Sequence, residues 1–312
     1  MPYNLILNSN NVIGNNNTFF RYNFIQGCLQ ISSDAELCVS QIIIPYSFFN
    51  LNNSLYSNTT FQYNWLGTVY TYTYKNGFYT TQDLNQALQL YMIQQGQYLY
   101  DTITQQNVYY IQFYTNATYY ANTIYCFSIP SSLPSNFTNP SGRFVFSTGS
   151  NTYTPQIMFT SNLSNILGFN QNVYYPPILQ TSNYSINSTQ TPNSTPINSV
   201  IVRCSLVNNN CSTPSDVLDT FYPNVSFGSN IVYNPAYEKW ISCNPGIYSD
   251  FEIYFSDQNF NQIQAQDPNV LISLLLRDSK KSKRQPNTSS VQFIPKSIKF
   301  KDEIFDSEEK NI

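Results

Sequence analysis

Three acidic residues in the last third of the sequence could take part in catalysis or in metal binding. Glu252, Asp257 and Asp267 could act as the paired carboxylates of a glycoside hydrolase or as oxygen ligands of a calcium ion. Asp257 and Asp267 also begin the segments Asp-Gln-Asn and Asp-Pro-Asn, which lie beside two predicted strands. Because Asp and Asn side chains accept hydrogen bonds from the backbone of turns, we favour a role in turns over catalysis or calcium binding.

Histidine is absent from the sequence. Its absence excludes Ser–His and Cys–His nucleophile pairs, histidine metal ligands and the usual general base near neutral pH. The six cysteines form no C-x-x-C pair, which argues against a zinc or dithiol site; they are Cys28, Cys38, Cys126, Cys204, Cys211 and Cys243. We therefore expect buried free thiols, no metal, no cofactor and no enzymatic activity.

Three tyrosine pairs form a second group of candidate binding residues. They are Tyr109-Tyr110, Tyr119-Tyr120 and Tyr174-Tyr175. Such rings could line a face on which a sugar or a base stacks. Tyrosines of a β-sandwich more often fill the core or an oligomer interface, and we favour that interpretation.

A basic run near the end of the chain is a candidate nucleic-acid contact; it consists of Lys280, Lys281, Lys283 and Arg284. Each cation near a phosphate releases counterions. However, residues 1–279 carry 6 basic and 12 acidic side chains, a net charge of −6, whereas residues 280–312 carry 8 and 5, a net charge of +3. The body therefore repels DNA, and the tail ends in acidic residues. We predict that the tail docks onto neighbouring subunits. Contact with a packaged genome is the second interpretation that we consider, and a solvated linker is the third.

Charged residues are scarce in the whole chain. They make up 10% of the 312 residues, against about 25% in average soluble domains. A bias towards AT-rich codons also enriches Asn, Ile, Tyr and Phe, but it would enrich lysine too, and residues 1–279 contain only Lys75 and Lys239. We infer that both causes operate. A surface with few charges can be buried against copies of itself without leaving unpaired ions at the contact.

Alternation of apolar residues with period two predicts most of the secondary structure. Aromatic residues make up 16% of the chain and favour strands over helices. The clearest strands are 20–31, 37–44, 60–74, 251–256 and 270–276, and shorter pieces lie at 107–114, 122–129, 143–147, 156–160 and 198–207. The strand 37–44 is apolar on both faces, which is typical of a central strand.

One amphipathic helix follows the third strand. Thr80 and Asp83 form an N-terminal cap, apolar residues recur at helical spacing, and Gly96 offers a C-terminal stop. We expect this helix on the outside of the sandwich. A short capped helix is predicted at 161–168, and the stretch 180–199 is predicted to be a long exposed loop.

The N-terminus gives a further expectation about the compartment. Met1-Pro2-Tyr3-Asn4 lacks the basic and apolar regions of a signal peptide, and no apolar run reaches membrane-span length. We expect a chain without a membrane span that is made and kept in a reducing, cytosolic compartment.

Four groups of segments together resemble the penton, or minor capsid, proteins of virophages, polinton-like elements and their larger viral relatives. The first is 40–50, a strand that ends in Phe48-Phe49-Asn50, and the second is the turn and helix start at 76–85. The third joins Val202-Arg203-Cys204-Ser205-Leu206 to 227–231, and the fourth joins 256–259 to 267–277. These motifs are turns and strands rather than a catalytic signature, and they span roughly residues 1–279.

The resemblance implies an all-β fold: a jelly-roll β-sandwich over 1–279 with an inserted β-rich region, one amphipathic helix and a C-terminal tail, 280–312. Because 107–235 carries more strand-like pieces than one eight-stranded roll requires, we place the insertion within it. The implied function is that of a structural virion protein: a homopentamer at an icosahedral capsid vertex. Its implied partners are the major capsid protein and other minor capsid proteins, and its implied location is the virion, assembled in the host cell cytoplasm.

Two other classes of function stay open at this point. One is a carbohydrate-binding jelly-roll module or host-attachment protein, and the other is a glycoside-active enzyme. A secreted lectin should carry a signal peptide or disulfide spacing, and an enzyme should bring carboxylates together in a cleft. Neither feature is evident in the sequence.

Overall fold

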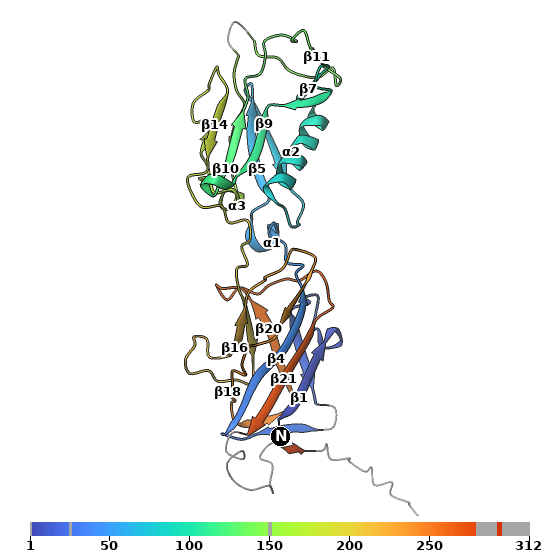
Figure 1. Cartoon of the computed structure of the whole chain (residues 1–312), viewed down its shortest axis with the longest axis vertical. Helices are drawn as coiled ribbons and strands as arrows, with labels where there is room; N and C mark the ends of the chain where they lie inside the picture. The colour runs from blue at the N-terminus through green and yellow to red at the C-terminus, as the bar shows by residue number, and fades with distance from the viewer. Residues whose placement is uncertain (1, 25–26, 149–151, 279–291, 295–312) are drawn as a thin grey trace, which may run out of the picture. The chain divides into compact units, whose positions relative to one another are not determined.

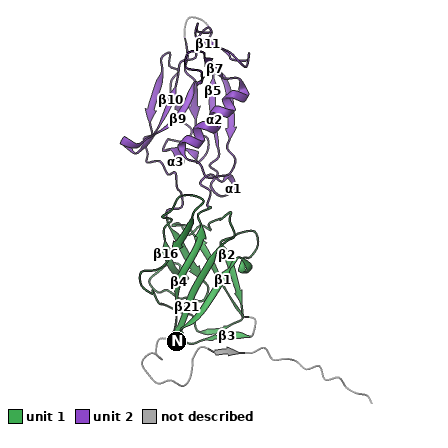
Figure 2. Ribbon diagram, turned by 45° about the vertical axis from the view of Figure 1, so that its right-hand side comes forward, with its two compact units in different colours: residues 1–47, 199–312 green, residues 48–198 purple. Residues whose placement is uncertain are grey.

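The computed structural model describes residues 2–24, 27–148, 152–278 and 292–294. The chain divides into two compact units (Figure 2): unit 1 comprises residues 1–47 and 199–312, and unit 2 comprises residues 48–198. Unit 2 is thus inserted into the sequence of unit 1. The inserted stretch begins at Phe48, well before the predicted range 107–235.

Unit 1 is a β-sandwich whose eight main strands follow the jelly-roll path (Figure 1). In chain order they are β1 (Tyr3–Asn8), β2 (Phe19–Asn23), β4 (Ala35–Pro45), β15 (Val200–Cys204), β16 (Val217–Phe221), β17 (Asn230–Tyr233), β20 (Asp250–Ser256) and β21 (Leu271–Asp278). One sheet has the order β1-β21-β4-β17, and the other has the order β16-β15-β20-β2. With the eight strands numbered along the chain, the orders are 1-8-3-6 and 5-4-7-2, which is the double Greek key of a jelly roll. The all-β prediction is confirmed.

Three short strands and the tail complete unit 1. Strand β18 (Ile241–Ser242) also pairs with β4. A small sheet has the order β19-β3-β22, formed by β19 (Gly246–Tyr248), β3 (Cys28–Ile31) and β22 (Gln292–Ile294). Strand β22 therefore brings a segment of the predicted tail alongside a strand of the roll.

Alternation explains why these segments form a sandwich. Along β21, Ile272, Leu274 and Leu276 are fully buried between the two sheets, whereas the residues between them are partly exposed. Each buried aliphatic side chain contributes about 1.5–3 kcal/mol through removal of apolar area from water. Phe221 of β16 stacks on Tyr233 of β17 at a ring distance of 5.1 Å, which links the two sheets through an aromatic contact.

Unit 2 combines three small sheets with helices around an aromatic core. Its strands are β5 (Thr60–Trp65), β6 (Thr68–Thr73), β7 (Tyr98–Asp101), β8 (Gln106–Tyr109), β9 (Ile111–Asn116), β10 (Ala121–Cys126), β11 (Phe137–Thr138), β12 (Gln156–Met158), β13 (Tyr174–Tyr175) and β14 (Tyr184–Asn187). Its helices are α1 (Asn53–Tyr56), α2 (Thr81–Gln95) and α3 (Leu163–Leu167). The sheets have the orders β13-β12-β5-β6, β14-β10-β9 and β11-β7-β8. Rings from several strands fill the core, among them Phe61, Trp65, Phe113 and Phe159.

Helix α2 has the predicted caps. The Thr80 side chain accepts a hydrogen bond from the Asp83 N–H, the Asp83 carboxylate accepts from the Thr80 N–H, and Gly96 ends the helix in the left-handed conformation. The helix belongs to unit 2, however, where it packs on β9, and it does not cover the sandwich as we expected. Its apolar stripe closes the aromatic core of unit 2 through Leu84, Leu88 and Met92.

Three other expectations differ from the structure within unit 2. The segment 60–74 forms the hairpin β5–β6 rather than one strand, because Leu66 and Gly67 turn the chain with φ values of 50° and 92°. The predicted loop 180–199 contains strand β14, which pairs with β10. No strand forms among the described residues of 143–147.

Asn50 holds two segments of unit 2 together. Its side chain is 2% exposed. The amide donates to the backbone carbonyls of Tyr79 and Ser194, both at 2.8 Å, and its oxygen accepts from the Tyr79 N–H at 2.8 Å. One buried amide thus joins the segment before α2 to the segment after β14; Ser194 lies 144 positions after Asn50 along the chain.

Candidate interaction surfaces

The outer face of the sheet β1-β21-β4-β17 exposes aliphatic side chains. We call this surface the aliphatic face and define it by Ile6, Ile43, Val232, Leu271 and Leu275. Ile6 is 51% exposed and Val232 is 50% exposed, and the other three are partly exposed. The opposite side of the same strands faces the core, so β4 carries apolar residues on both sides, as the sequence predicted for 37–44; on β1, Ile6 lies between the exposed Asn4 and Asn8.

Strand register brings three of these residues into one row. Leu271 of β21 lies opposite Ile43 of β4, and Ile43 lies opposite Val232 of β17. Residues directly opposite one another in a sheet have neighbouring side chains on the same face. Single exposed apolar residues are ordinary on a protein surface, whereas neighbouring ones make this face a candidate interaction surface.

Charged and aromatic side chains end the aliphatic face. The Nε atom of Arg277 donates to Glu36 on β4 at 2.9 Å, and its guanidinium carbon lies 3.8 Å from the ring centre of Trp240. An Arg over an indole is stabilised by the charge distribution of the ring. Arg277 and Trp240 together form an aromatic and cationic surface beside β18.

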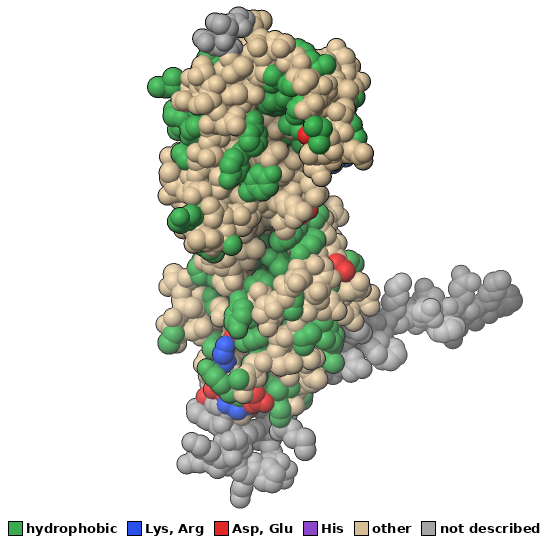
Figure 3. Space-filling model, turned by 45° about the horizontal axis from the view of Figure 1, so that its top comes forward, with side chains coloured by type: hydrophobic (Ala, Val, Ile, Leu, Met, Phe, Trp, Pro, Cys, Tyr) green, Lys and Arg blue, Asp and Glu red, His purple; other side chains and the backbone are tan. Residues whose placement is uncertain are grey.

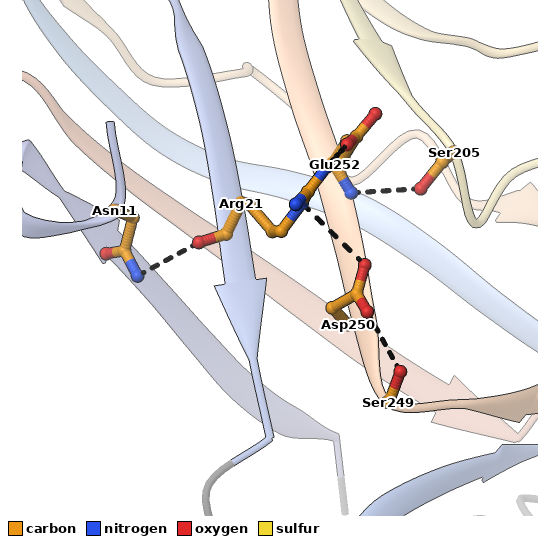
Figure 4. Close-up of polar contacts among 6 residues, drawn as sticks. All are labelled: Asn11, Arg21, Ser205, Ser249, Asp250 and Glu252. Atoms are coloured by element: carbon orange, nitrogen blue, oxygen red, sulfur yellow. Dashed lines mark hydrogen bonds and ion pairs between the residues drawn. The ribbon is translucent and has the colours of Figure 1, made fainter. Parts of the chain in front are cut away.

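The outer face of the other sheet carries ion pairs (Figure 4). Arg21 of β2 binds Glu252 of β20, and its Nε atom lies 3.9 Å from Asp250. The backbone N–H of Glu252 donates to the Ser205 hydroxyl at 2.9 Å. The hydrogen bond and the charge of Glu252 raise the pKa of Arg21 above its ordinary value. Because exposed ion pairs contribute only about 0–1 kcal/mol to stability, this cluster matters mainly as a polar surface.

A hollow of about 420 Å³ lies next to this cluster, lined by Phe19, Arg203, Glu252, Tyr254, Phe260 and Gln262. Arg203 pairs with Asp216 at 2.8 Å, and the Tyr254 hydroxyl donates to the same carboxylate at 2.7 Å. Burial and the Asp216 carboxylate raise the pKa of Tyr254 to about 12. The Arg203 guanidinium also lies 4.6 Å from the Tyr254 ring centre. The two sheets of unit 1 therefore present different chemistry: one face is aliphatic and the other is charged and aromatic.

Asp219 links the two sheets inside unit 1. Its side chain is 3% exposed and accepts from Lys239 Nζ at 2.7 Å and from the Tyr233 hydroxyl at 2.8 Å. Asp219 lies on β16, whereas Tyr233 lies on β17 of the other sheet. The hydrogen bond with Asp219 is the main cause that raises the pKa of Lys239 in the folded chain. The Asp219–Lys239 pair therefore stabilises the folded chain at pH values below the ordinary lysine pKa. This stabilisation is lost as the pH rises through the higher pKa that Lys239 has in the folded chain.

Replacing Lys239 with Met is expected to destabilise unit 1 by about 2 kcal/mol, because the buried Asp219 carboxylate loses its cation. The loss is smaller than the ~3–5 kcal/mol of a fully buried pair, because the Lys239 side chain is 36% exposed. Urea unfolding measures the change. Arg21→Met, which breaks an exposed pair, is the control and should change the stability much less; equal effects of the two variants would contradict this role of Asp219.

The structure separates the predicted site residues from one another. Asp257 accepts from the N–H groups of Asn259 and Asn261, both at 2.8 Å, and Asp267 accepts from the Asn269 N–H at 2.9 Å. Both aspartates therefore do what the turn interpretation predicts. Glu252, in contrast, pairs with Arg21.

The tyrosine pairs and the cysteines occupy different environments. Tyr110 and Tyr175 are buried, at 5% and 4% exposure, whereas Tyr119 and Tyr120 are exposed. Four cysteines are buried, Cys28 is partly buried and Cys211 is exposed, and all six are free thiols. Tyr110 and Tyr175 thus fill the core, one of the two roles predicted for the tyrosine pairs, whereas Tyr119-Tyr120 lies on the surface, where the predicted alternative is an oligomer interface.

The basic residues Lys280, Lys281, Lys283 and Arg284 lie outside the described residues. Within the described ranges, no group of three or more Cys, Asp or Glu side chains could hold a metal ion. Nor does any helix in those ranges combine the length and the apolar character needed to cross a membrane.

Sequence reasoning missed the Arg203–Asp216–Tyr254 cluster, the Asp219–Lys239–Tyr233 contacts and the role of Asn50. The sequence contained one indication of the Arg203–Asp216–Tyr254 cluster. Arg203 and Tyr254 are polar or amphipathic residues that interrupt the apolar pattern of their strands. The Asn50 contacts join residues far apart along the chain, so no local pattern indicates them.

Several solved structures are similar to this chain, and two of them are described here. No family model matches the sequence, and no curated protein matches it. The crystal structure of the mavirus penton protein has a TM-score of 0.42 and 11% identity, over 88% of this chain and 98% of that chain. A chain of the cryo-EM structure of the Sputnik virophage has a TM-score of 0.34 and 13% identity, over 91% of this chain and 99% of that chain.

Proposed function

We propose that the chain is a structural virion protein: a penton, or minor capsid, subunit that forms homopentamers at icosahedral vertices and contacts the major capsid protein. It acts by assembly, without catalysis. The observation that carries the proposal is the aliphatic face on the jelly roll of unit 1. The proposal agrees with the role named for the mavirus penton protein, and it depends on the features of this chain.

The aliphatic face is the core of the proposed subunit contact. Interfaces bury apolar side chains at their centre and place charged groups at their rim. The row Leu271–Ile43–Val232 is apolar, and the charged pair Arg277–Glu36 lies towards the opposite end of β21 and β4. The occupant that we propose for this face is a neighbouring copy of the same chain.

A ring requires two different surfaces on each copy. A head-to-tail interface closes into a ring, whereas contact between two identical patches stops at a dimer. The two sheets of unit 1 present different outer faces, one aliphatic and one with Arg21, Glu252 and the Arg203 cluster. Because the two outer faces are unlike, the aliphatic face of one copy meets a different surface of its neighbour, which favours a ring over a dimer.

Charge supports a docking role for the tail. Outside the tail, the sequence of unit 1 carries 4 basic and 10 acidic residues, a net charge of −6, whereas residues 280–312 have a net charge of +3. The positively charged tail is therefore attracted to the negatively charged body of a neighbouring subunit. A second tail, which carries the same charge, repels it. We propose docking onto neighbouring capsid subunits as its role, with genome contact second.

Replacing Val232 with Asp is expected to lower the association constant of the subunits by about 100-fold or more, because a carboxylate would be buried in the contact without a partner. Light scattering coupled to size exclusion measures the mass, and electron microscopy of negatively stained particles shows whether rings form. Val69→Asp is the matched control, since Val69 is 51% exposed and lies on β6 of unit 2.

Three results would overturn the proposal: a wild-type chain that stays monomeric at high concentration, a wild-type dimer without rings, or failure to enter particles when it is expressed with the major capsid protein. A carbohydrate-binding module, the alternative function, predicts monomers that bind glycans. That alternative does not require the aliphatic face.

A further inference from the structure

We infer that unit 2 contains a binding site for an uncharged saccharide. The site is a hollow of about 380 Å³ between the start of α2, the end of β9, the start of β10 and the segment 192–195. Its walls include Phe78, Thr81, Thr115, Tyr120, Asn122 and Thr195. This volume lies within the range of about 300–1,000 Å³ that is typical of small-ligand sites. The inference goes beyond the proposed vertex function and does not depend on it.

The lining of this hollow carries no charged side chain that would favour a charged ligand. It contains no Lys, Arg, Asp or Glu, and residues 48–198 contain only four charged side chains, which are Lys75, Asp83, Asp101 and Arg143. Phosphate and nucleic-acid ligands need cations that neutralise them. The N-terminus of α2 does not supply such a site, because the Asp83 carboxylate already binds the Thr80 N–H at 2.9 Å and brings a negative charge. The chemistry of the walls therefore fits a neutral ligand.

Hydroxyl and amide groups provide the polar contacts that a polyhydroxylated ligand needs. Thr81, Thr115, Asn116, Ser194 and Thr195 all line the hollow. Such groups both donate and accept hydrogen bonds, as sugar hydroxyls do. A few polar groups set among apolar walls orient a ligand and give specificity.

Buried hydrogen bonds hold the walls in place. The Thr81 hydroxyl donates to Asn122 Oδ1 at 2.9 Å, and the Asn122 amide donates to the Leu167 carbonyl at 3.2 Å. Asn122 is 3% exposed. Asn50 fixes Tyr79 and Ser194, which belong to two of the walls. A site that is already formed spends less free energy on ordering when the ligand binds.

Tyr120 presents an aromatic ring at this hollow. It is 76% exposed and ends a 3₁₀ turn in the left-handed conformation, with φ = 50°. A residue other than glycine is disfavoured there by about 1–2 kcal/mol, and such strain is concentrated at functional sites. The apolar face of a pyranose ring can pack on the exposed ring of Tyr120 while its hydroxyls bond to the threonine and amide groups.

The test is saturation-transfer NMR with the full chain and four neutral probes: methyl β-galactoside, lactose, maltose and chitobiose. Sialyllactose and a heparin hexasaccharide are the anionic probes. We expect transfer to at least one neutral probe. We also expect Tyr120→Ala to weaken that binding at least about tenfold, one 1.4 kcal/mol step in affinity, while Tyr119→Ala does not change it. Tyr119 is the matched control because it is adjacent, 71% exposed and absent from the lining.

Thr115→Val gives a second variant that keeps the side-chain volume and removes one hydroxyl from the wall. It should weaken binding several-fold without changing the thermal unfolding of unit 2. The inference is overturned if no neutral probe receives saturation, if the anionic probes bind better than the neutral ones, or if Tyr120→Ala and Thr115→Val both bind like the wild type. Because none of these readouts involves assembly, failure here leaves the proposed vertex function unaffected.

Discussion

The free energy of unfolding is expected to change little between about pH 6 and pH 9 and to fall steeply above pH 9. The chain has no histidine, so no side chain with an ordinary pKa near 6.5 titrates in the lower range. The groups that respond to alkali are buried tyrosines and cysteines. Burial raises the pKa of Tyr110 to about 12 and the pKa of Cys243 to about 12, from ordinary values of 10.0 and 9.0.

Several more groups act in the same direction. Burial raises the pKa of Cys38 to about 11 and the pKa of Cys204 to about 12, and it raises the pKa values of Tyr63, Tyr74 and Cys126 further. In the unfolded chain these groups lose their protons near pH 9–10, whereas in the folded chain they keep them. The unfolded state therefore binds fewer protons as the pH rises, and each group lowers the free energy of unfolding by about 1.4 kcal/mol per pH unit until its folded pKa is reached.

Urea unfolding at pH values from 7 to about 11 measures this fall. The two tryptophans report on the units separately, because Trp65 lies in the core of unit 2 and Trp240 lies in unit 1. Tyr110→Phe should make the fall in unit 2 less steep, since it removes one contributor, whereas Tyr119→Phe at an exposed position should leave it unchanged. Equal stability at pH 8 and pH 11 would contradict the expectation.

Replacing Asn50 with Ala is expected to lower the free energy of unfolding of unit 2 by about 3 kcal/mol or more. The substitution removes three hydrogen bonds and leaves the Tyr79 N–H and two carbonyl groups without their partner, each at a cost of about 1–3 kcal/mol when it stays buried. Solvent that enters the opened segment offsets part of this cost. The same change releases two walls of the saccharide site.

Urea unfolding followed by Trp65 fluorescence measures the effect of Asn50→Ala. Asn53→Ala is the control, because Asn53 is exposed and its side chain accepts one hydrogen bond, from the Thr59 hydroxyl at 3.2 Å; it should cost less than about 1 kcal/mol. An Asn50 variant as stable as the Asn53 variant would show that the three contacts do not hold unit 2 together.

Local patterns predicted the elements whose signals lie close together in the sequence. Helix α2 is confirmed because Thr80, Asp83 and Gly96 define its two ends within one short segment. Strands β4, β20 and β21 are confirmed because burial on one or both faces imposes period-two alternation. The hairpin turn at Leu66-Gly67 was missed, although the alternation changes phase there: Phe61, Tyr63 and Trp65 occupy odd positions, whereas Tyr70, Tyr72 and Tyr74 occupy even ones.

The insertion and the interaction surfaces depend on contacts between distant residues. Strand β4 pairs with β21 and β17, and no pattern near β4 indicates that the next 151 residues form another unit. A compositional signal was available, because only four of those residues are charged. The surface in Figure 3 shows the result, with few acidic or basic side chains among uncharged polar and hydrophobic ones. Registers such as Leu271–Ile43–Val232 follow only from the folded sheet.

Unit 2 occupies one continuous stretch of sequence between two consecutive main strands of the jelly roll. A single recombination event that exchanges this stretch of the gene therefore replaces a complete unit, with its core, its helix and its hollow. The strands that form the aliphatic face stay unchanged in such an exchange, because they lie before and after the insertion. The proposed ligand site and the proposed subunit contact thus lie on separate segments of one gene, so selection can act on each of them without changing the other.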